Sequence, residues 1–159
     1  MKILVSFSKS PATTSKIAFK NNNIQFEDAG VQWIINIYDE WYALVRAIEL
    51  KEKDATAVIH LITVGGADCD AIIRKALALG DNEAIRINVQ NNNSYYIAAQ
   101  IAEVVKQNSY VLILTGKESI DYKSSSIGGT IAELLDISFI SLATKLVLEG
   151  GIATVTPRH

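Results

Sequence analysis

The chain has 159 residues, with 15 Lys and Arg against 17 Asp and Glu, and both signs are scattered along it. The net charge of −2 argues against a nucleic-acid binder, which needs a clustered basic surface to neutralise phosphates. The single cysteine, Cys69, excludes an intrachain disulfide, and the two histidines, His60 and His159, offer no metal-ligand cluster.

The length fits one domain, residues 1–159, and provides ample material for a hydrophobic core. The N-terminus enters a strand pattern at once, without the apolar segment and cleavage site of a signal peptide. No stretch is apolar for long enough to span a bilayer. We therefore expect a cytoplasmic protein without a membrane span.

Short apolar runs alternate with helical patterns along the chain. Strands are expected at residues 2–8, 56–64, 84–89, 111–115, 139–148 and 152–155. Helices are expected from residue 39, with apolar positions through residue 50, and at 68–79, 95–107 and 126–135. Ser94 is the expected N-cap of the third helix, and Gly80 is the expected C-terminal cap of the second. This alternation predicts an α/β fold with a doubly wound, mostly parallel, Rossmann-like sheet.

The segment between the first strand and the first helix predicts a small hairpin excursion. Residues 16–19 and 24–26 flank three consecutive asparagines at 21–23, and asparagine tolerates the positive φ of tight turns. Residues 31–37 are apolar and expected to be extended.

Three segments follow strands at the edge where an open α/β sheet binds ligands. They are residues 6–8, residues 64–66 and the stretch 115–129. The last stretch reaches Ser124, Ser125, Ser126 and Gly128 at a helix start, where hydroxyls and free N–H groups suit a phosphate. A simple helix cap is the competing explanation. Neither Gly-x-Gly-x-x-Gly nor a Walker-type Gly-Lys-Ser/Thr is present.

Other polar residues have plain structural explanations. His60 lies inside an apolar strand and is expected to be a satisfied core histidine. Two explanations apply to Cys69, which lies near a helix start: a reactive thiol with a lowered pKa, or a small structural residue. We favour the structural residue. Asp39 and Glu40 begin a helix, where carboxylates complement the dipole. No Ser/His/Asp or Cys/His arrangement is evident, so no catalytic residue is assigned.

Several blocks, in order, resemble the β subunit of electron-transferring flavoproteins. Residues 11–17 (PATTSKI) are similar to the family's Pro-Asp-x-x-x-Lys-Ile, and residues 36–40 (NIYDE) to its Asn-Pro-(aromatic)-Asp-Glu. Residues 74–80 (RKALALG) look like Arg-x-Ala-Leu-Ala-Met-Gly, and residues 116–121 (GKESID) resemble Gly-Lys-Gln-Ala-Ile-Asp. Each block is modest alone, but together they cover most of the chain.

The resemblance implies an electron-carrier subunit and not an enzyme acting alone. It implies an adenine nucleotide in this chain, either AMP or FAD, and a heterodimer with an α subunit that contributes most of a FAD site. It also implies that electrons arrive from acyl-CoA or other dehydrogenases and leave to a quinone oxidoreductase or another acceptor.

The resemblance and the strand-end segments together give one set of candidate cofactor-binding residues. These are Ser6, Asn36, Ile37, Tyr38, Asp39, Val64, Gly65, Gly116, Lys117, Ser119, Asp121, Ser124, Ser125, Ser126, Ile127 and Gly128. Tyr38 takes the position of the family's aromatic residue that approaches a flavin ring.

The chain departs from the family pattern at two motifs. Ile37 replaces the proline after Asn36, and the acidic Asp-Asp-Asp-x-Asn-Gln-Thr-Gly loop has become residues 121–128 (DYKSSSIG). The motif's Asn and Thr become Ser125 and Ile127, so AMP and FAD both stay open as ligands.

Family members also continue beyond this length, through an arm around the α subunit and a docking loop for dehydrogenases, so we expect a truncated subunit that associates weakly. The alternatives are a stand-alone adenine-nucleotide sensor of the universal-stress-protein type, and a remnant fold that binds nothing and only dimerises through its aromatic-rich segment.

Overall fold

The computed structural model describes residues 1–36, 39–80, 83–91, 93–117 and 125–158. Its centre is a four-stranded parallel sheet in the order β7-β6-β1-β8. The strands are β1 (Lys2–Ser6), β6 (Val58–Val64), β7 (Glu83–Ile87) and β8 (Leu112–Leu114). Four of the six predicted strands therefore form one sheet, and the predicted α/β class is confirmed.

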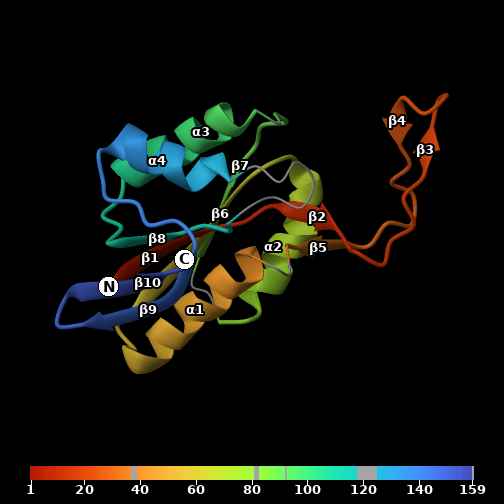
Figure 1. Cartoon of the computed structure of the whole chain (residues 1–159). Helices are drawn as coiled ribbons and strands as arrows, with labels where there is room; N and C mark the ends of the chain where they lie inside the picture. Colours follow the sequence, from red (N-terminus) through yellow and green to blue (C-terminus); the bar gives the residue numbers. More distant parts are fainter. Residues whose placement is uncertain (37–38, 81–82, 92, 118–124, 159) are drawn as a thin grey trace.

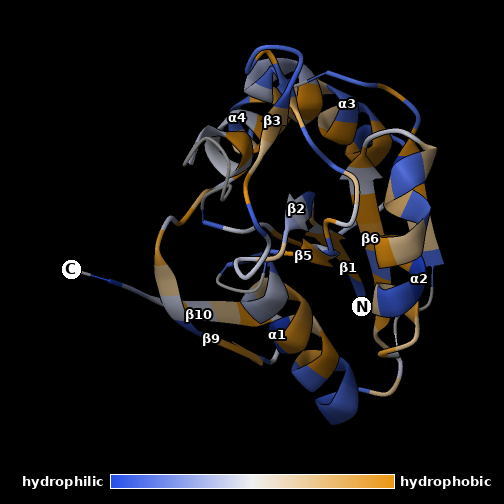
Figure 2. Cartoon of the chain, turned by 90° about the vertical axis from the view of Figure 1, so that its right-hand side faces the viewer, coloured by the Kyte–Doolittle hydropathy of each residue, from blue (hydrophilic) through white to orange (hydrophobic). Residues whose placement is uncertain are grey.

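Helices cover both faces of this sheet (Figure 1). They are α1 (Glu40–Lys53), α2 (Asp70–Leu77, preceded by a 3₁₀ turn at Ala67–Cys69), α3 (Ser94–Lys106) and α4 (Ser126–Leu135). Ile3 and Val5 of β1 lie in the core beneath α1 and α2, whereas Leu4 between them lies in the core beneath α3 and α4. This alternation is the period of a strand that is buried on both faces. Strand β6 is also buried along most of its length, and Figure 2 shows that it is predominantly hydrophobic.

The helices form where apolar residues recur at helical spacing. In α3 the buried residues Ala98, Ile101, Ala102 and Val105 follow an i, i+3, i+4, i+7 pattern. The predicted N-cap at Ser94 is wrong by one position. Asn93 caps the helix, because its side-chain oxygen accepts a hydrogen bond from the Tyr96 N–H at 3.0 Å.

Between β1 and α1 the chain leaves the body of the molecule and returns. Strands β2 (Lys9–Pro11) and β5 (Trp33–Ile35) pair antiparallel, and beyond them β3 (Phe19–Lys20) pairs with β4 (Gln25–Phe26). We call residues 17–28 the arm, which projects away from the sheet and helices (Figure 1). The predicted hairpin is confirmed, and its three asparagines, residues 21–23, all adopt positive φ.

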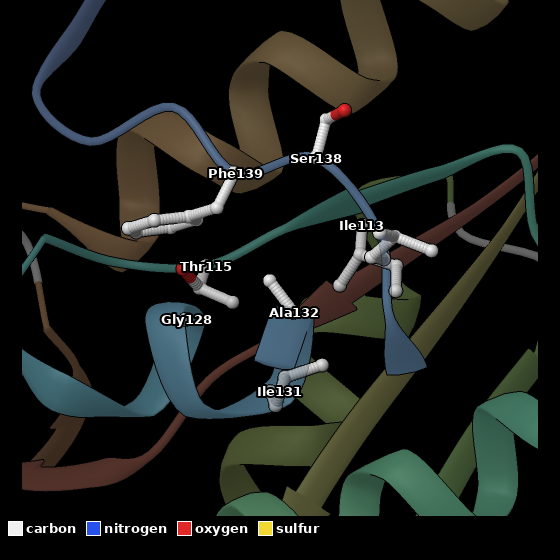
Figure 3. Close-up of a pocket in the computed structure, with 8 residues that line it drawn as sticks. Ile113, Thr115, Gly128, Ile131, Ala132, Ser138 and Phe139 are labelled. Atoms are coloured by element: carbon white, nitrogen blue, oxygen red, sulfur yellow. The ribbon is translucent and has the colours of Figure 1, made fainter. Parts of the chain in front are cut away.

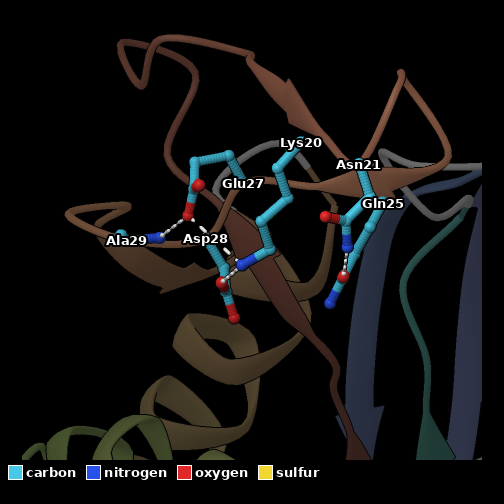
Figure 4. A network of polar contacts seen from close by, with 6 residues as sticks. All are labelled: Lys20, Asn21, Gln25, Glu27, Asp28 and Ala29. Carbon is cyan, nitrogen blue, oxygen red and sulfur yellow. Dashed lines mark hydrogen bonds and ion pairs between the residues drawn. The ribbon is translucent and has the colours of Figure 1, made fainter.

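Polar contacts at the surface of the arm connect its side chains to one another (Figure 4). Lys20 Nζ lies 3.3 Å from a carboxylate oxygen of Glu27 and 3.3 Å from one of Asp28. Asn21 donates a side-chain hydrogen bond to Gln25 at 2.8 Å. Exposed ion pairs of this kind contribute little to stability.

After α4 the chain forms an antiparallel hairpin of β9 (Ala143–Glu149) and β10 (Ile152–Pro157). Gly150 and Gly151 at its turn have positive φ, as expected for the predicted junction. Leu146 of β9 packs into the core beside α1, and its carbonyl oxygen accepts a hydrogen bond from the Arg46 guanidinium. Residues 139–142, predicted as the start of the strand, lie outside it and are exposed.

No helix within the described residues is long and apolar enough to cross a membrane.

Candidate functional site

The order of strands changes direction between β1 and β8. From β1 the chain proceeds outward to β6 and β7, then returns across the sheet to β8 on the other side of β1. In open α/β sheets, ligands bind beyond the carboxyl ends of strands at such a switch point. We use the term carboxyl-edge site for the described segments there: residues 6–8, 36, 39–40, 64–65, 115–117 and 125–128.

A buried carboxylate joins the end of β1 to the start of α1. Glu40, the first residue of α1, accepts hydrogen bonds from the Ser8 backbone N–H and from the Ser8 hydroxyl, both at 2.8 Å. Asn36, which is fully buried, accepts a hydrogen bond from the Trp41 N–H through its carbonyl oxygen at 2.9 Å. These contacts fix the first turn of α1 against the strand end.

Burial controls the ionisation of Glu40. Removal of the carboxyl from water raises its pKa from 4.5 to about 7, in spite of hydrogen bonds from Ser8 and Asn36 that favour the charged form. The negative charge of Asp39 adds to the upward shift. Glu40 therefore changes charge near neutral pH, unlike an ordinary surface glutamate.

Gly116 lets the loop after β8 approach the start of α1. A Cβ atom at residue 116 would lie 2.5 Å from Glu40 Cγ, 3.2 Å from the Glu40 backbone nitrogen and 3.4 Å from Asp39 Cβ. Gly65, after β6, is comparably close to its own neighbour, since an added Cβ would lie 2.5 Å from Cys69 Sγ. Both glycines thus have a packing reason for their small size, separate from any ligand.

The start of α4 is packed against β8 by a second close approach. A Cβ at Gly128 would lie 2.8 Å from Thr115 Oγ1 and 3.0 Å from the Phe139 ring. Thr115, Gly128 and Phe139 are among the residues that line a pocket of about 50 Å³. In Figure 3 the Phe139 ring lies over Thr115 and Gly128. The remaining lining residues are mostly apolar: Ile113, Ile131, Ala132, Ile137 and Ser138.

The N-termini of α1 and α4 differ in what faces them. The carboxylate of Glu40 lies at the start of α1, where it would repel an anion. In the described part of the chain, Ser125 makes no side-chain capping bond at the start of α4. The first amides of any α-helix lack intrahelical acceptors and attract anions. A phosphate therefore suits the α4 end of the site better than the α1 end.

The structure brings several predicted residues together. Asn36, Asp39 and Gly116 lie around Glu40. Ser8, which also contacts Glu40, follows the predicted residue Ser6 by two positions. Ser125, Ser126 and Gly128 lie at the start of α4. Val64 ends β6, the strand beside β1, and Gly65 follows it.

Two more predicted residues of this edge differ in their exposure. Ile127 packs against the core beneath α3 and α4. Lys117 is exposed. Ile37, Tyr38, Ser119, Asp121 and Ser124 lie outside the described residues.

Sequence reasoning missed the role of Glu40. A carboxylate at a helix start is ordinarily explained by the helix dipole, and Asp39 with Glu40 was interpreted in that way. Asp39 occupies the N-cap position, but among the described residues its side chain makes no capping bond. Glu40 instead contacts Ser8, 32 positions earlier, and no local pattern predicts a contact at that separation. Phe139 was likewise missed, because it was assigned to a strand.

His60 and Cys69 have the structural roles favoured from sequence. His60 Nδ1 lies 3.0 Å from the Tyr110 hydroxyl and Nε2 lies 3.4 Å from Glu83, while burial lowers the histidine pKa. Burial raises the pKa of the Cys69 thiol, so the reactive thiolate is disfavoured.

Comparison with known proteins gives a consistent result. A sequence model described as the electron transfer flavoprotein domain matches residues 23–158. The chain is 38% identical to an electron transfer flavoprotein subunit beta of Bacillus subtilis, over 94% of this chain and 58% of that protein. It is 33% identical to the corresponding subunit of Syntrophomonas wolfei, over 98% of this chain and 61% of that protein.

A human electron transfer flavoprotein subunit beta is 27% identical over 94% of this chain and 60% of its own length. The chain thus spans about three fifths of the length of these relatives.

Proposed function

Because this chain belongs to the electron transfer flavoprotein family, in which its relatives are β subunits, we propose that it binds an adenine nucleotide, AMP or FAD, at the carboxyl-edge site. We further propose that it acts as an electron-carrier subunit beside an α subunit that holds FAD. Electrons would pass from acyl-CoA or other dehydrogenases to an acceptor. When bound, the FAD supplies the redox chemistry, and the protein supplies binding and orientation.

The observation that carries this proposal is the convergence of the candidate segments at the switch point. Segments that are far apart in sequence meet around Glu40: Ser8 after β1, Asn36 before α1, and Gly116 after β8. The start of α4 adjoins them through Gly128 and Thr115. Topology alone selects this edge for a ligand, and the family resemblance selects the same segments.

The residues present suit the proposed ligand in chemical terms. A nucleotide needs donors for its phosphate and a less polar wall for its base. The first-turn amides of α4 and the hydroxyls of Ser125 and Ser126 are suitable phosphate donors. Ser6 ends β1 and Gly65 follows β6, and both are small residues that are partly exposed.

Two measurements test the proposal. The purified protein is denatured and any released small molecule is identified by mass, with AMP or FAD expected. The melting temperature is then followed with added AMP, ADP and FAD, because a ligand that binds only the folded state raises it. A protein that releases nothing and shows no shift at saturating nucleotide would contradict nucleotide binding.

A third measurement tests the carrier role separately. The chain is mixed with a FAD-loaded electron transfer flavoprotein α subunit, and complex formation is followed by gel filtration at 450 nm, roughly where oxidised flavin absorbs. Co-elution of the two chains is expected. Nucleotide binding without complex formation would instead favour a stand-alone sensor of the universal-stress-protein type.

A further inference from the structure

Glu40 contacts three segments of the carboxyl-edge site at once. Its carboxylate accepts hydrogen bonds from the Ser8 N–H and hydroxyl, and the Asn36 backbone is hydrogen-bonded to it as well. Its Cγ fills the space in which a side chain at residue 116 would lie. The side chain is 9% exposed, so these contacts are made almost entirely away from water.

One side chain thus contacts segments that follow β1, precede α1 and follow β8. Ser8 and Asn36 adjoin the paired strands β2 and β5, in which Lys9 lies opposite Ile35, and Gly116 follows β8. Glu40 therefore adds side-chain contacts between segments that the strand pairing already brings near one another. Two short hydrogen bonds to a buried carboxylate hold Ser8 in place and restrict its backbone. The close contact with Gly116 then sets how near the loop after β8 can come.

Among the described residues, no Lys or Arg forms an ion pair with the Glu40 carboxylate. On its own helix, the neighbouring Asp39 is also acidic. On the β1 side Ser8 is neutral, and the following Lys9 directs its ammonium to Asp68 and to the Trp33 ring, 3.9 Å from the ring centroid. On the β8 side Gly116 is neutral. An anion bound in the same site would add to this unfavourable charge.

We propose that Glu40 is a proton-linked positioning residue, which holds Ser8, Asn36 and Gly116 against one another by its side-chain contacts and makes nucleotide affinity depend on pH. This inference rests on the proposed nucleotide site. A bound phosphate favours the neutral form of Glu40, so binding takes up a proton. By linkage, affinity falls as the pH rises through neutrality, where Glu40 ionises.

The test follows the Ser8 backbone amide of the intact chain by NMR as the pH is raised, with and without saturating AMP. Because this amide donates to the Glu40 carboxylate, its chemical shift reports the ionisation of Glu40. We expect a midpoint near pH 7 without AMP and a higher midpoint with AMP, by about half a unit or more. An unchanged midpoint in a protein that binds AMP would overturn the inference.

Calorimetric titrations of AMP near pH 6 and pH 8 add the matching affinity measurement. The AMP phosphate itself titrates in this range, so Glu40→Gln, which lacks the ionisable group, is the reference. Between pH 6 and pH 8 the dissociation constant should rise in both proteins. We expect the factor of increase to be about three times larger for the wild type than for the variant. Identical pH profiles of the two proteins would overturn the inference.

Ser8→Ala is the companion variant, because it removes the hydroxyl donor and keeps both the carboxylate and the backbone bond. It should retain the pH dependence with weaker binding. Loss of the pH dependence in this variant would count against Glu40 as its source.

Failure of the wild type to bind AMP or FAD at either pH would contradict the proposed function itself. The two failures are therefore distinguishable.

Discussion

The carboxyl-edge site and the arm are both built from segments that leave the central sheet, but they are held by different forces. At the site, Glu40 and Asn36 are buried and their polar atoms are bonded within the protein. In the arm, Lys20, Glu27 and Asp28 interact at the surface, and Ile24 is 87% exposed. Buried polar contacts are costly to break, whereas exposed ion pairs are readily replaced by water. We therefore expect substitutions at the site to matter far more than substitutions in the arm.

The largest expected difference in stability is between a substitution in the core beneath the site and a substitution in the arm. Leu44→Ala removes a side chain that is 1% exposed between α1 and the sheet, and should destabilise the protein by about 2–5 kcal/mol. Ile24→Ala in the arm should change stability by at most about 0.5 kcal/mol. Chemical denaturation of the two variants measures both values. Similar losses would mean that the arm is packed against something in solution.

The next effect concerns the pH dependence of stability. Because the folded pKa of Glu40 is raised, the folded protein holds a proton that the unfolded chain releases between pH 4.5 and about 7. Glu40 should therefore make stability fall as the pH rises through this window, by up to about 3 kcal/mol. Glu40→Gln should remove that contribution, while Glu52→Gln, on the exposed side of α1, should keep it. Denaturation curves at several pH values check this, and parallel curves for wild type and Glu40→Gln would contradict it.

Two adjacent glycines of α4 should respond in opposite directions. Gly128→Ala forces a Cβ against Thr115 and Phe139, and should cost about 1–3 kcal/mol. At Gly129 the nearest atom to an added Cβ is 3.5 Å away, on the Phe139 ring, so Gly129→Ala should stabilise the helix by roughly 0.5–1 kcal/mol. Thermal melts of the two variants give the signs. Equal effects would mean that the start of α4 is not held against β8.

The smallest effect is expected for the ion pairs of the arm. Lys20→Ala removes the contacts to Glu27 and Asp28, all of which are at the surface. The melting temperature and nucleotide affinity should both stay at wild-type values within error. A clear loss of nucleotide affinity would show that the arm takes part in the site.

The sequence predicted the architecture well because the signals were local. Continuous apolar runs such as 56–64 mark strands buried on both faces, and the helical period of residues 98–105 marks α3. The three asparagines at 21–23 likewise predicted a turn from their own tolerance of positive φ.

The details of the site were less predictable, because they depend on contacts between distant residues. The contact between Ser8 and Glu40, and the packing of Phe139 on Gly128, join positions that no local pattern relates. The family resemblance indicated which segments form the candidate site, but it did not predict that Glu40 is buried.

The central claim is that an adenine nucleotide binds at the carboxyl-edge site, and NMR mapping with AMP tests it most directly. Backbone amide shifts of the intact, isotope-labelled chain are recorded as AMP is added. The account predicts changes concentrated at residues 6–8, 36–40, 64–65, 115–117 and 125–128, with little change in the arm or in the β9–β10 hairpin. Changes that cluster in the arm or the hairpin, or the absence of any change at saturating AMP and FAD, would contradict it.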